Sequence, residues 1–219
     1  MDDFDIGNVI KSLSQHKPLF HSEDDLQSSF ADEVRKVYPK AQVQREVPYK
    51  NIEGLSDNDE AEYASGLNKI DLYITINDRH ILIEFKYKTK PINIFFNNCE
   101  YNLSDDGARN DNRYLFLRDL SKLESYIINK YNNHNITEAY AVFITNEKKY
   151  QDSIKGSVIE DFELSDGCIK TGALYHKNGR QKVFLAGQNL ISWSEYSRVE
   201  CDKDNIFWVC VVKVINPEL

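Results

Sequence analysis

The chain has 219 residues, which is long enough for one folded domain with a substantial core. With 41% hydrophobic and 28% charged residues, its composition is far from that of a disordered protein. Its formal net charge of −8 argues against a protein that coats nucleic acid through a basic surface, although a local basic groove can coexist with it. Four cysteines without a C-x-x-C pair predict no zinc site. The acidic N-terminus and the lack of a long apolar run predict a cytoplasmic protein without a signal peptide or membrane span.

The chain begins with a short amphipathic segment around residues 4–13, which we interpret as an appendage, and a helix is predicted after it. Ser22 followed by Asp25 resembles a capping box, and the helix that it begins runs to about Val37, before Pro39. Its apolar stripe consists of Leu26, Phe30, Val34 and Val37.

Strands are predicted next. Residues 42–47 alternate between polar and apolar side chains, whereas the polar, glycine-containing residues 50–68 predict a loop. Residues 69–76 and 80–87 each place apolar side chains at every second position, as half-buried strands do. The Asn-Asp dipeptide between these two segments tolerates positive φ, so the pattern predicts a hairpin with a two-residue turn.

The rest of the chain is less regular. Residues 90–113 are rich in Asn and Asp, and their pattern does not distinguish a helix, a strand or a loop. A helix from about Leu117 to Tyr131 and a buried strand at 138–145 follow, as in a crossover unit. The C-terminal third alternates turns with short strand-like runs and ends in the apolar segment 206–215.

The predicted hairpin brings two acids together. Side chains alternate faces along a strand, so a two-residue turn places Asp71 directly opposite Glu84 on one face, with Lys86 two residues further on that face. Opposed residues of this kind have Cβ atoms roughly 4.5–5.5 Å apart. A three-residue turn would instead place Asp71 opposite Phe85 and separate the group.

This constellation predicts metal chemistry. Two opposed carboxylates repel each other, and a divalent cation such as Mg²⁺ (or Mn²⁺) offsets that repulsion with oxygen ligands from Asp71, Glu84 and the backbone carbonyl of Phe85. Lys86 is placed to position the attacking water or to stabilise charge on a phosphate. The chemistry that these groups favour is metal-assisted hydrolysis of a phosphodiester.

The sequence I-D-L-Y-I at 70–74, followed by E-F-K at 84–86, resembles the PD-(D/E)xK superfamily of restriction-endonuclease-like nucleases, with Ile70 where the proline usually stands. The resemblance covers about residues 20–145. It implies a catalytic set of Asp71, Glu84 and Lys86 with an acid from the first helix, a nucleic-acid substrate that is DNA rather than RNA, and a role in restriction, defence or repair. A homodimer or a partner subunit is consistent with it.

We therefore expect one α/β domain over residues 1–219, with a restriction-endonuclease-like core at about 20–145. Its mixed central β-sheet would be flanked by helices. Residues from about 146 to 219 would form a β-rich C-terminal extension. The sequence contains no repeat, low-complexity tract or linker that would divide the chain.

The acid that completes the site is left with three candidates. Glu23 and Glu33 both fall on or beside the apolar face of the first helix, where an acid usually has a partner or a metal. We favour Glu23, with Gln27 beside it as a nucleic-acid contact, because this stretch is similar to the helix of that family. Glu46 on the first strand is the third candidate.

Each of these interpretations has a simpler alternative. Arg109 and Arg113 are candidates for phosphate contacts, with ordinary surface ion pairs equally expected. Lys88 is a further candidate contact, although charge that protects an edge strand is the commoner role. A D-x12-E-x-K string by itself often marks only a solvated strand face. A nuclease fold that has lost catalysis and binds nucleic acid or a protein partner is the alternative function.

Overall fold

A computed structural model describes residues 3–48, 69–129, 136–179, 181–199 and 205–214. The loop predicted at 50–68 lies outside these residues. In the described part of the chain, no helix is both long and apolar enough to cross a membrane.

The centre of the molecule is a six-stranded mixed sheet with the strand order β1-β2-β3-β6-β10-β9. All neighbours are antiparallel except β3 and β6, which are parallel. The strands are β1 (Gln42–Pro48), β2 (Lys69–Ile76), β3 (Arg79–Lys88), β6 (Ile136–Thr145), β9 (Trp193–Arg198) and β10 (Ile206–Val214). A mixed α/β architecture with a mixed central sheet, as predicted, is confirmed.

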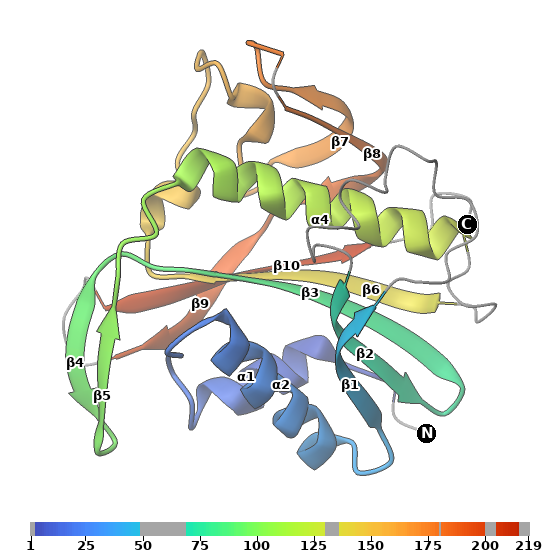
Figure 1. Cartoon of the computed structure of the whole chain (residues 1–219), viewed down its shortest axis with the longest axis vertical. Helices are drawn as coiled ribbons and strands as arrows, with labels where there is room; N and C mark the ends of the chain where they lie inside the picture. Colours follow the sequence, from blue (N-terminus) through green and yellow to red (C-terminus); the bar gives the residue numbers. More distant parts are fainter. Residues whose placement is uncertain (1–2, 49–68, 130–135, 180, 200–204, 215–219) are drawn as a thin grey trace.

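Helices cover both faces of this sheet (Figure 1). On one face lie α1 (Ile6–Ser14) and α2 (Glu23–Val37), and on the other lies α4 (Arg109–Asn129). Beyond α4 packs a separate hairpin of β7 (Ile169–Tyr175) and β8 (Lys182–Leu190). Two short 3₁₀ helices, Lys148–Tyr150 and Glu160–Phe162, connect β6 to this hairpin.

The N-terminus of α2 forms as its sequence predicts. The Ser22 side chain accepts a hydrogen bond from the Asp25 N–H at 3.1 Å, and the Asp25 carboxylate accepts one from the His21 N–H at 2.9 Å. The helix ends at Val37, with Tyr38 as its C-cap, because the following Pro39 disfavours further helix. The first residue of α2, Glu23, accepts a hydrogen bond from the Tyr87 N–H at 2.8 Å, which holds this end of the helix beside β3.

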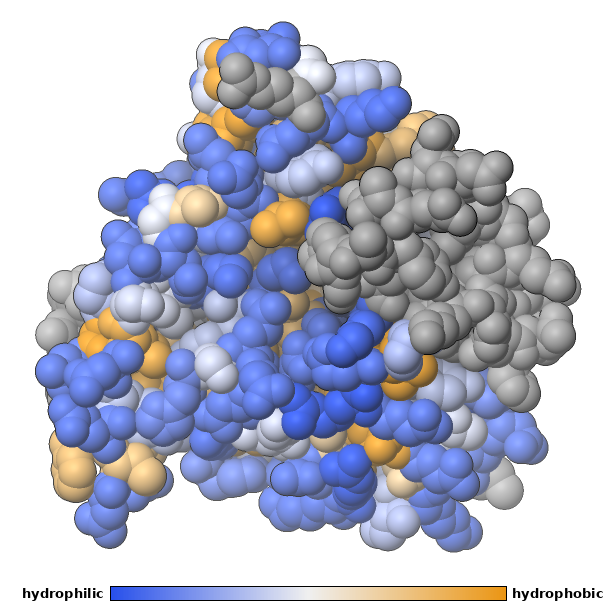
Figure 2. Space-filling model, in the orientation of Figure 1, coloured by the Kyte–Doolittle hydropathy of each residue, from blue (hydrophilic) through white to orange (hydrophobic). Residues whose placement is uncertain are grey.

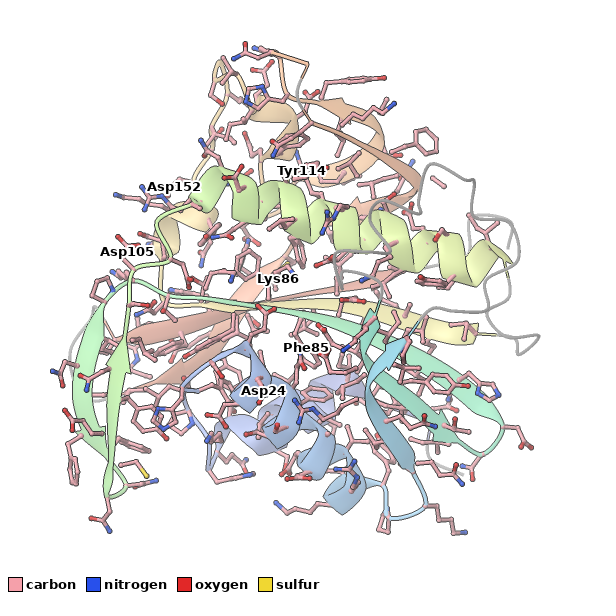
Figure 3. All side chains as sticks on the ribbon, in the orientation of Figure 1. Asp24, Phe85, Lys86, Asp105, Tyr114 and Asp152 are labelled. Atoms are coloured by element: carbon pink, nitrogen blue, oxygen red, sulfur yellow. The ribbon has the colours of Figure 1, made fainter. Side chains whose placement is uncertain are left out.

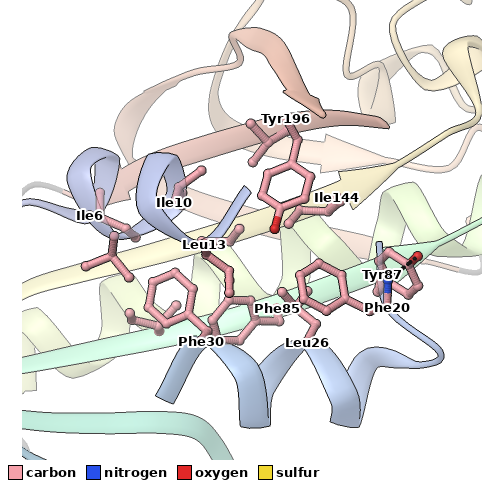
Figure 4. Packing of buried hydrophobic residues seen from close by; sticks show 14 of the residues in the cluster. Ile6, Ile10, Leu13, Phe20, Leu26, Phe30, Phe85, Tyr87, Ile144 and Tyr196 are labelled. Atoms are coloured by element: carbon pink, nitrogen blue, oxygen red, sulfur yellow. Dashed lines mark hydrogen bonds between the residues drawn. The ribbon is translucent and has the colours of Figure 1, made fainter. Parts of the chain in front are cut away.

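A core of aromatic and aliphatic side chains joins α1 and α2 to the sheet (Figure 4). Phe30 of α2 packs edge-on against Phe85 of β3, with ring centroids 5.1 Å apart. Phe20 packs in the same way against Tyr87, at 5.5 Å. The alternation predicted for β3 is therefore real, because Phe85 and Tyr87 face this core and leave the residues between them to the other face.

Three parts of the fold were not predicted. Residues 90–113 contain a hairpin of β4 (Ile92–Phe96) and β5 (Cys99–Leu103), and α4 begins at Arg109 rather than near Leu117. The first two turns of α4 are polar, so they show no apolar periodicity. The C-terminal third is β-rich, but β9 and β10 complete the central sheet, so residue 145 does not separate a core from an extension.

Glu124 of α4 holds the β7–β8 hairpin against the helix. Its buried carboxylate accepts hydrogen bonds from the N–H groups of Ala186 and Gly187 at 2.6 and 3.1 Å, and from the Asn189 amide at 2.8 Å. We expect Glu124→Ala to lower the free energy of unfolding by about 3 kcal/mol, because buried donors lose their acceptor. Urea denaturation measures this. A surface control, Glu195→Ala, should change stability by less than about 0.5 kcal/mol, and equal effects would contradict the assignment.

Candidate active site

The β2–β3 hairpin has the predicted register. A two-residue turn joins the strands, with φ of 48° and 63° at its two residues. The paired ladder runs back from this turn to Leu72 opposite Ile83. The next residues along the two strands are Asp71 and Glu84, so the two acids lie side by side where the ladder between β2 and β3 ends.

Asp71 is anchored across the gap between these strands. Its carboxylate accepts a hydrogen bond from the Phe85 N–H at 2.6 Å. Burial raises the pKa of Asp71 from 3.8 to about 6, and the nearby carboxylate of Glu23 adds to this rise. The Phe85 N–H and the ammonium groups of Lys86 and Lys122 offset only part of it. Asp71 is therefore an acid whose charge is poorly stabilised by the protein alone.

Glu84 is more deeply buried, with 4% of its surface exposed. Its Oε1 atom lies 2.6 Å from Nζ of Lys122 on α4. Burial raises the pKa of Glu84 well above its ordinary value, and the carboxylates of Asp71 and Asp119 raise it further. The single positive charge of Lys122 does not offset the effect of burial and of two neighbouring acids.

Lys86 points from β3 toward α4, whereas Phe85 points toward α1 and α2 (Figure 3). The Nζ atom of Lys86 lies 2.7 Å from Oδ2 of Asp119 and 4.0 Å from Oε1 of Glu23, and it donates to the Phe85 carbonyl at 3.2 Å. Burial by itself would lower the pKa of Lys86, but these carboxylates raise it above its ordinary value. Lys86 is therefore a fixed ammonium group.

The candidates for the third acid separate clearly. Glu23 accepts a hydrogen bond from the Tyr87 N–H at 2.8 Å, and its carboxylate lies between Lys86 and Lys88, at 4.0 and 3.9 Å. Glu33 is instead paired with His16 at 3.2 Å and with Lys36, and it accepts a hydrogen bond from Ser12. Glu46 pairs with Lys69 at 3.5 Å. Of the three, the structure brings only Glu23 to the carboxylate pair.

The sequence prediction missed the contribution of α4. Asp119 and Lys122 are three residues apart and so share one face of the helix, which turns toward β3. Asp119 lies at helical spacing from the buried Phe116 and Leu123. An acid on an apolar helix face usually has a partner, which is the rule that singled out the acids of the first helix. The same rule would have identified Asp119.

The donor set fits a divalent cation of the Mg²⁺ type. In the described ranges, no three or more His, Cys, Asp or Glu side chains gather as a ready-made metal cage. Asp71, Glu84 and the Phe85 carbonyl supply three oxygens, and Mg²⁺ typically takes one or two carboxylates plus waters and substrate oxygens. Burial, with a smaller contribution from neighbouring carboxylates, raises the pKa of both acids, so their ionised forms are poorly stabilised by the protein alone and a divalent ion would stabilise them.

The four residues predicted to contact nucleic acid differ in their position and in their partners. Lys88 lies at the site, with Asp106 at 4.0 Å, and Arg109 pairs with Glu147 at 3.4 Å. Gln27 is buried, and its Oε1 atom accepts a hydrogen bond from Arg45 at 3.5 Å.

Arg113 is not placed to contact phosphate, so this interpretation is wrong. Its side chain is 3% exposed and donates to the Lys149 carbonyl, with its guanidinium 5.2 Å from the centre of the Tyr150 ring. Burial lowers the pKa of Arg113 below its ordinary value. Its helical spacing from the buried residues of α4 explains its inward direction, so Arg113 joins α4 to the segment after β6.

Comparisons of this chain with family models, with curated proteins and with solved structures give no match.

Proposed function

We propose that this chain is a metal-dependent nuclease with a restriction-endonuclease-like fold, hydrolysing phosphodiester bonds of nucleic acid, DNA rather than RNA. The observation that carries the proposal is the meeting of Asp71, Glu84 and Lys86 at the point where β2 and β3 part. The parallel pairing of β3 with β6 also supports the proposal. The crossover between these strands runs through α4, so this helix lies over the end of β3 that carries Glu84 and Lys86.

The chemistry divides among named groups. Asp71, Glu84 and the Phe85 carbonyl would hold Mg²⁺ or Mn²⁺, which when bound lowers the pKa of water and offsets charge on the scissile phosphate. Lys86 orients the attacking water through its ammonium and donates to a phosphate oxygen as negative charge develops there. Asp119 and the more distant Glu23 keep Lys86 charged, and Glu23, which the Tyr87 N–H holds in place, helps to aim it at the phosphate.

Metal binding tests this proposal at its first step. We expect Mg²⁺ or Mn²⁺ to raise the melting temperature, since an ion at a hundred times its Kd stabilises the folded state by about 2.7 kcal/mol. Thermal melts of the chain with either ion, set against KCl of equal ionic strength, measure this. No difference between the divalent salt and KCl would overturn metal-dependent catalysis.

A second candidate is a module that binds nucleic acid or a protein partner without cutting. The Lys122–Glu84 ion pair favours it, because this cation stands where a metal would otherwise act on Glu84. Such a module predicts binding without cleavage and without metal-dependent stabilisation. The same melts, followed by a binding assay with duplex DNA, distinguish the two functions.

A further inference from the structure

The β4–β5 hairpin stands apart from the central sheet, at the end of β3 (Figure 1). Its inner face is apolar and packs on the core: Ile92, Tyr101 and Leu103 are buried, and Ile94 and Phe96 pack against them. The Tyr101 ring stacks on His21 at 4.2 Å, just before α2 begins. The hairpin is therefore a firmly seated part of the fold.

The outer face of the hairpin has a different chemistry. Asn93 lies directly opposite Asn102, and Phe95 lies directly opposite Glu100, so these four side chains share the face turned away from the core. All four are exposed, and Phe95, at 67%, is the most exposed large apolar side chain in the described part of the chain. Figure 2 shows apolar surface near the tip of this hairpin within a mostly hydrophilic face.

The base of the hairpin is tied to the candidate active site. The Thr89 N–H donates to the Asp106 carboxylate at 2.9 Å, and the Lys90 N–H donates to the Asn146 side chain at 2.8 Å. Three residues separate the end of β3 from the start of β4. The position of the outer face relative to Lys86 is therefore fixed by the strand that carries Lys86.

The four outer side chains match the groups that proteins use to read base edges. Asparagine pairs with N6 and N7 of adenine, glutamate accepts from N4 of cytosine, and phenylalanine contacts the methyl group of thymine. A two-stranded ribbon fits the major groove of B-form DNA. From this face we infer that the β4–β5 hairpin enters the major groove of duplex DNA and selects the sequence at which the chain acts.

Two further features favour duplex DNA. The major groove of RNA helices is too deep and narrow for side chains to read, so a ribbon of this kind discriminates against double-stranded RNA. The outer face itself carries no Lys or Arg, but the exposed Lys148 and Lys149 lie just after Asn146, beside the base of the hairpin. These cations suit phosphate contacts, which position a protein while base contacts specify sequence.

This inference rests on the proposed nuclease function, so its test uses binding and cleavage as separate readouts. A library of random-sequence duplex DNA is selected by binding to the full chain in EDTA, and the same library is cut in Mg²⁺. We expect a preferred sequence with adenine at defined positions. Asn93→Ala and Asn102→Ala should each lower the preference at one position roughly tenfold or more, and Phe95→Ala should lower a preference for thymine.

Matched controls come from the other exposed hairpin. Phe184 of β8 is 63% exposed and Asn178 is exposed in the β7–β8 turn, so Phe184→Ala and Asn178→Ala make the same chemical changes elsewhere. They should leave the selected sequence unchanged. No binding to duplex DNA, no preferred sequence, or the wild-type preference in all three hairpin variants would overturn the inference. Selective binding without cutting would uphold the hairpin and contradict the nuclease.

Discussion

An Asp71→Asn variant is expected to lose metal-dependent stabilisation and at least roughly a hundredfold in cleavage rate, while it folds as the wild type does. The amide removes the charge that attracts a cation, and loss of even a supporting group around a metal commonly costs about 10–100-fold. The new side chain can still accept the hydrogen bond from the Phe85 N–H through its Oδ1 atom. Thermal melts with Mn²⁺ and a cleavage assay measure the two effects.

The same variant is expected to be more stable than the wild type when metal is absent. The pKa of Asp71 is about 6 in the folded chain, against an ordinary value of 3.8, so ionised Asp71 destabilises the fold. Below pH 4 Asp71 is protonated in both the folded and the unfolded chain, so it does not destabilise the fold. As the pH rises from 4 through 6, the free energy of unfolding falls because the folded chain holds this proton more tightly. At pH 7 the Asn variant should gain up to about 3 kcal/mol, and this gain should vanish below pH 4.

A matched control is Asp161→Asn. The Asp161 carboxylate also accepts a hydrogen bond from a strand N–H, that of Tyr175 at 2.9 Å, but it lies far along the chain from the carboxylate pair. This variant should keep the metal response and change stability by less than about 1 kcal/mol. A destabilised Asp71→Asn, or one that responds to metal like the wild type, would contradict the roles given to Asp71.

Replacing Lys86 by methionine should have the second large effect. Cleavage is expected to fall at least roughly a hundredfold, because the water and the phosphate lose their ammonium group. Stability should also fall, by about 3 kcal/mol, since Asp119 is 5% exposed and its carboxylate loses the partner 2.7 Å away. Urea denaturation and cleavage rates at saturating metal give the two numbers.

A double variant separates these two roles of Lys86. Adding Asp119→Asn to Lys86→Met removes the stranded charge, so most of the stability should return while the cleavage rate stays low. Lys177→Met is the control, because Lys177 also pairs with a carboxylate, Glu160 at 2.9 Å, but on the surface. If cleavage returned together with stability, Lys86 would be a structural residue only.

The parts of the site that were predictable from sequence are those set by local rules. Strict alternation in β2 and β3 and a two-residue Asn-Asp turn determine which residues face each other, so the meeting of Asp71 and Glu84 follows by counting. The capping pattern at Ser22 likewise places Glu23 in the first turn of α2. Local geometry therefore predicted that Asp71, Glu84 and Lys86 meet, whereas Glu23 was favoured over Glu33 and Glu46 because of the family resemblance.

The β4–β5 hairpin was missed although a local signal exists. Asn97 and Asn98 both have positive φ, 48° and 62°, and they join two segments that alternate polar and apolar side chains. The surrounding Asn and Asp residues hide this alternation, because they are typical of loops. An Asn-Asn pair between two alternating segments therefore predicts a hairpin turn, just as the Asn-Asp pair does.

Other features depend on contacts that sequence patterns do not specify. Residues of β10 and β6 lie about seventy positions apart, and no periodicity within either strand says that they pair. The approach of Lys122 to Glu84 likewise depends on how α4 crosses the sheet. The pairing of β10 with β6 and the contact of Lys122 with Glu84 both depend on long-range packing. For this reason the sequence indicated a C-terminal extension where the structure has strands of the central sheet.

The nuclease function of the Asp71–Glu84 site is tested by a cleavage assay on linear and supercoiled duplex DNA, single-stranded DNA and RNA, with Mg²⁺ or Mn²⁺ and with EDTA. Wild type is compared with Asp71→Asn, which is expected to be folded and, without metal, more stable than the wild type. We expect metal-dependent cutting of duplex DNA by the wild type and none by the variant. If the wild type cuts no substrate and binds no metal, or if both proteins cut alike, Asp71 and Glu84 do not form a nuclease site.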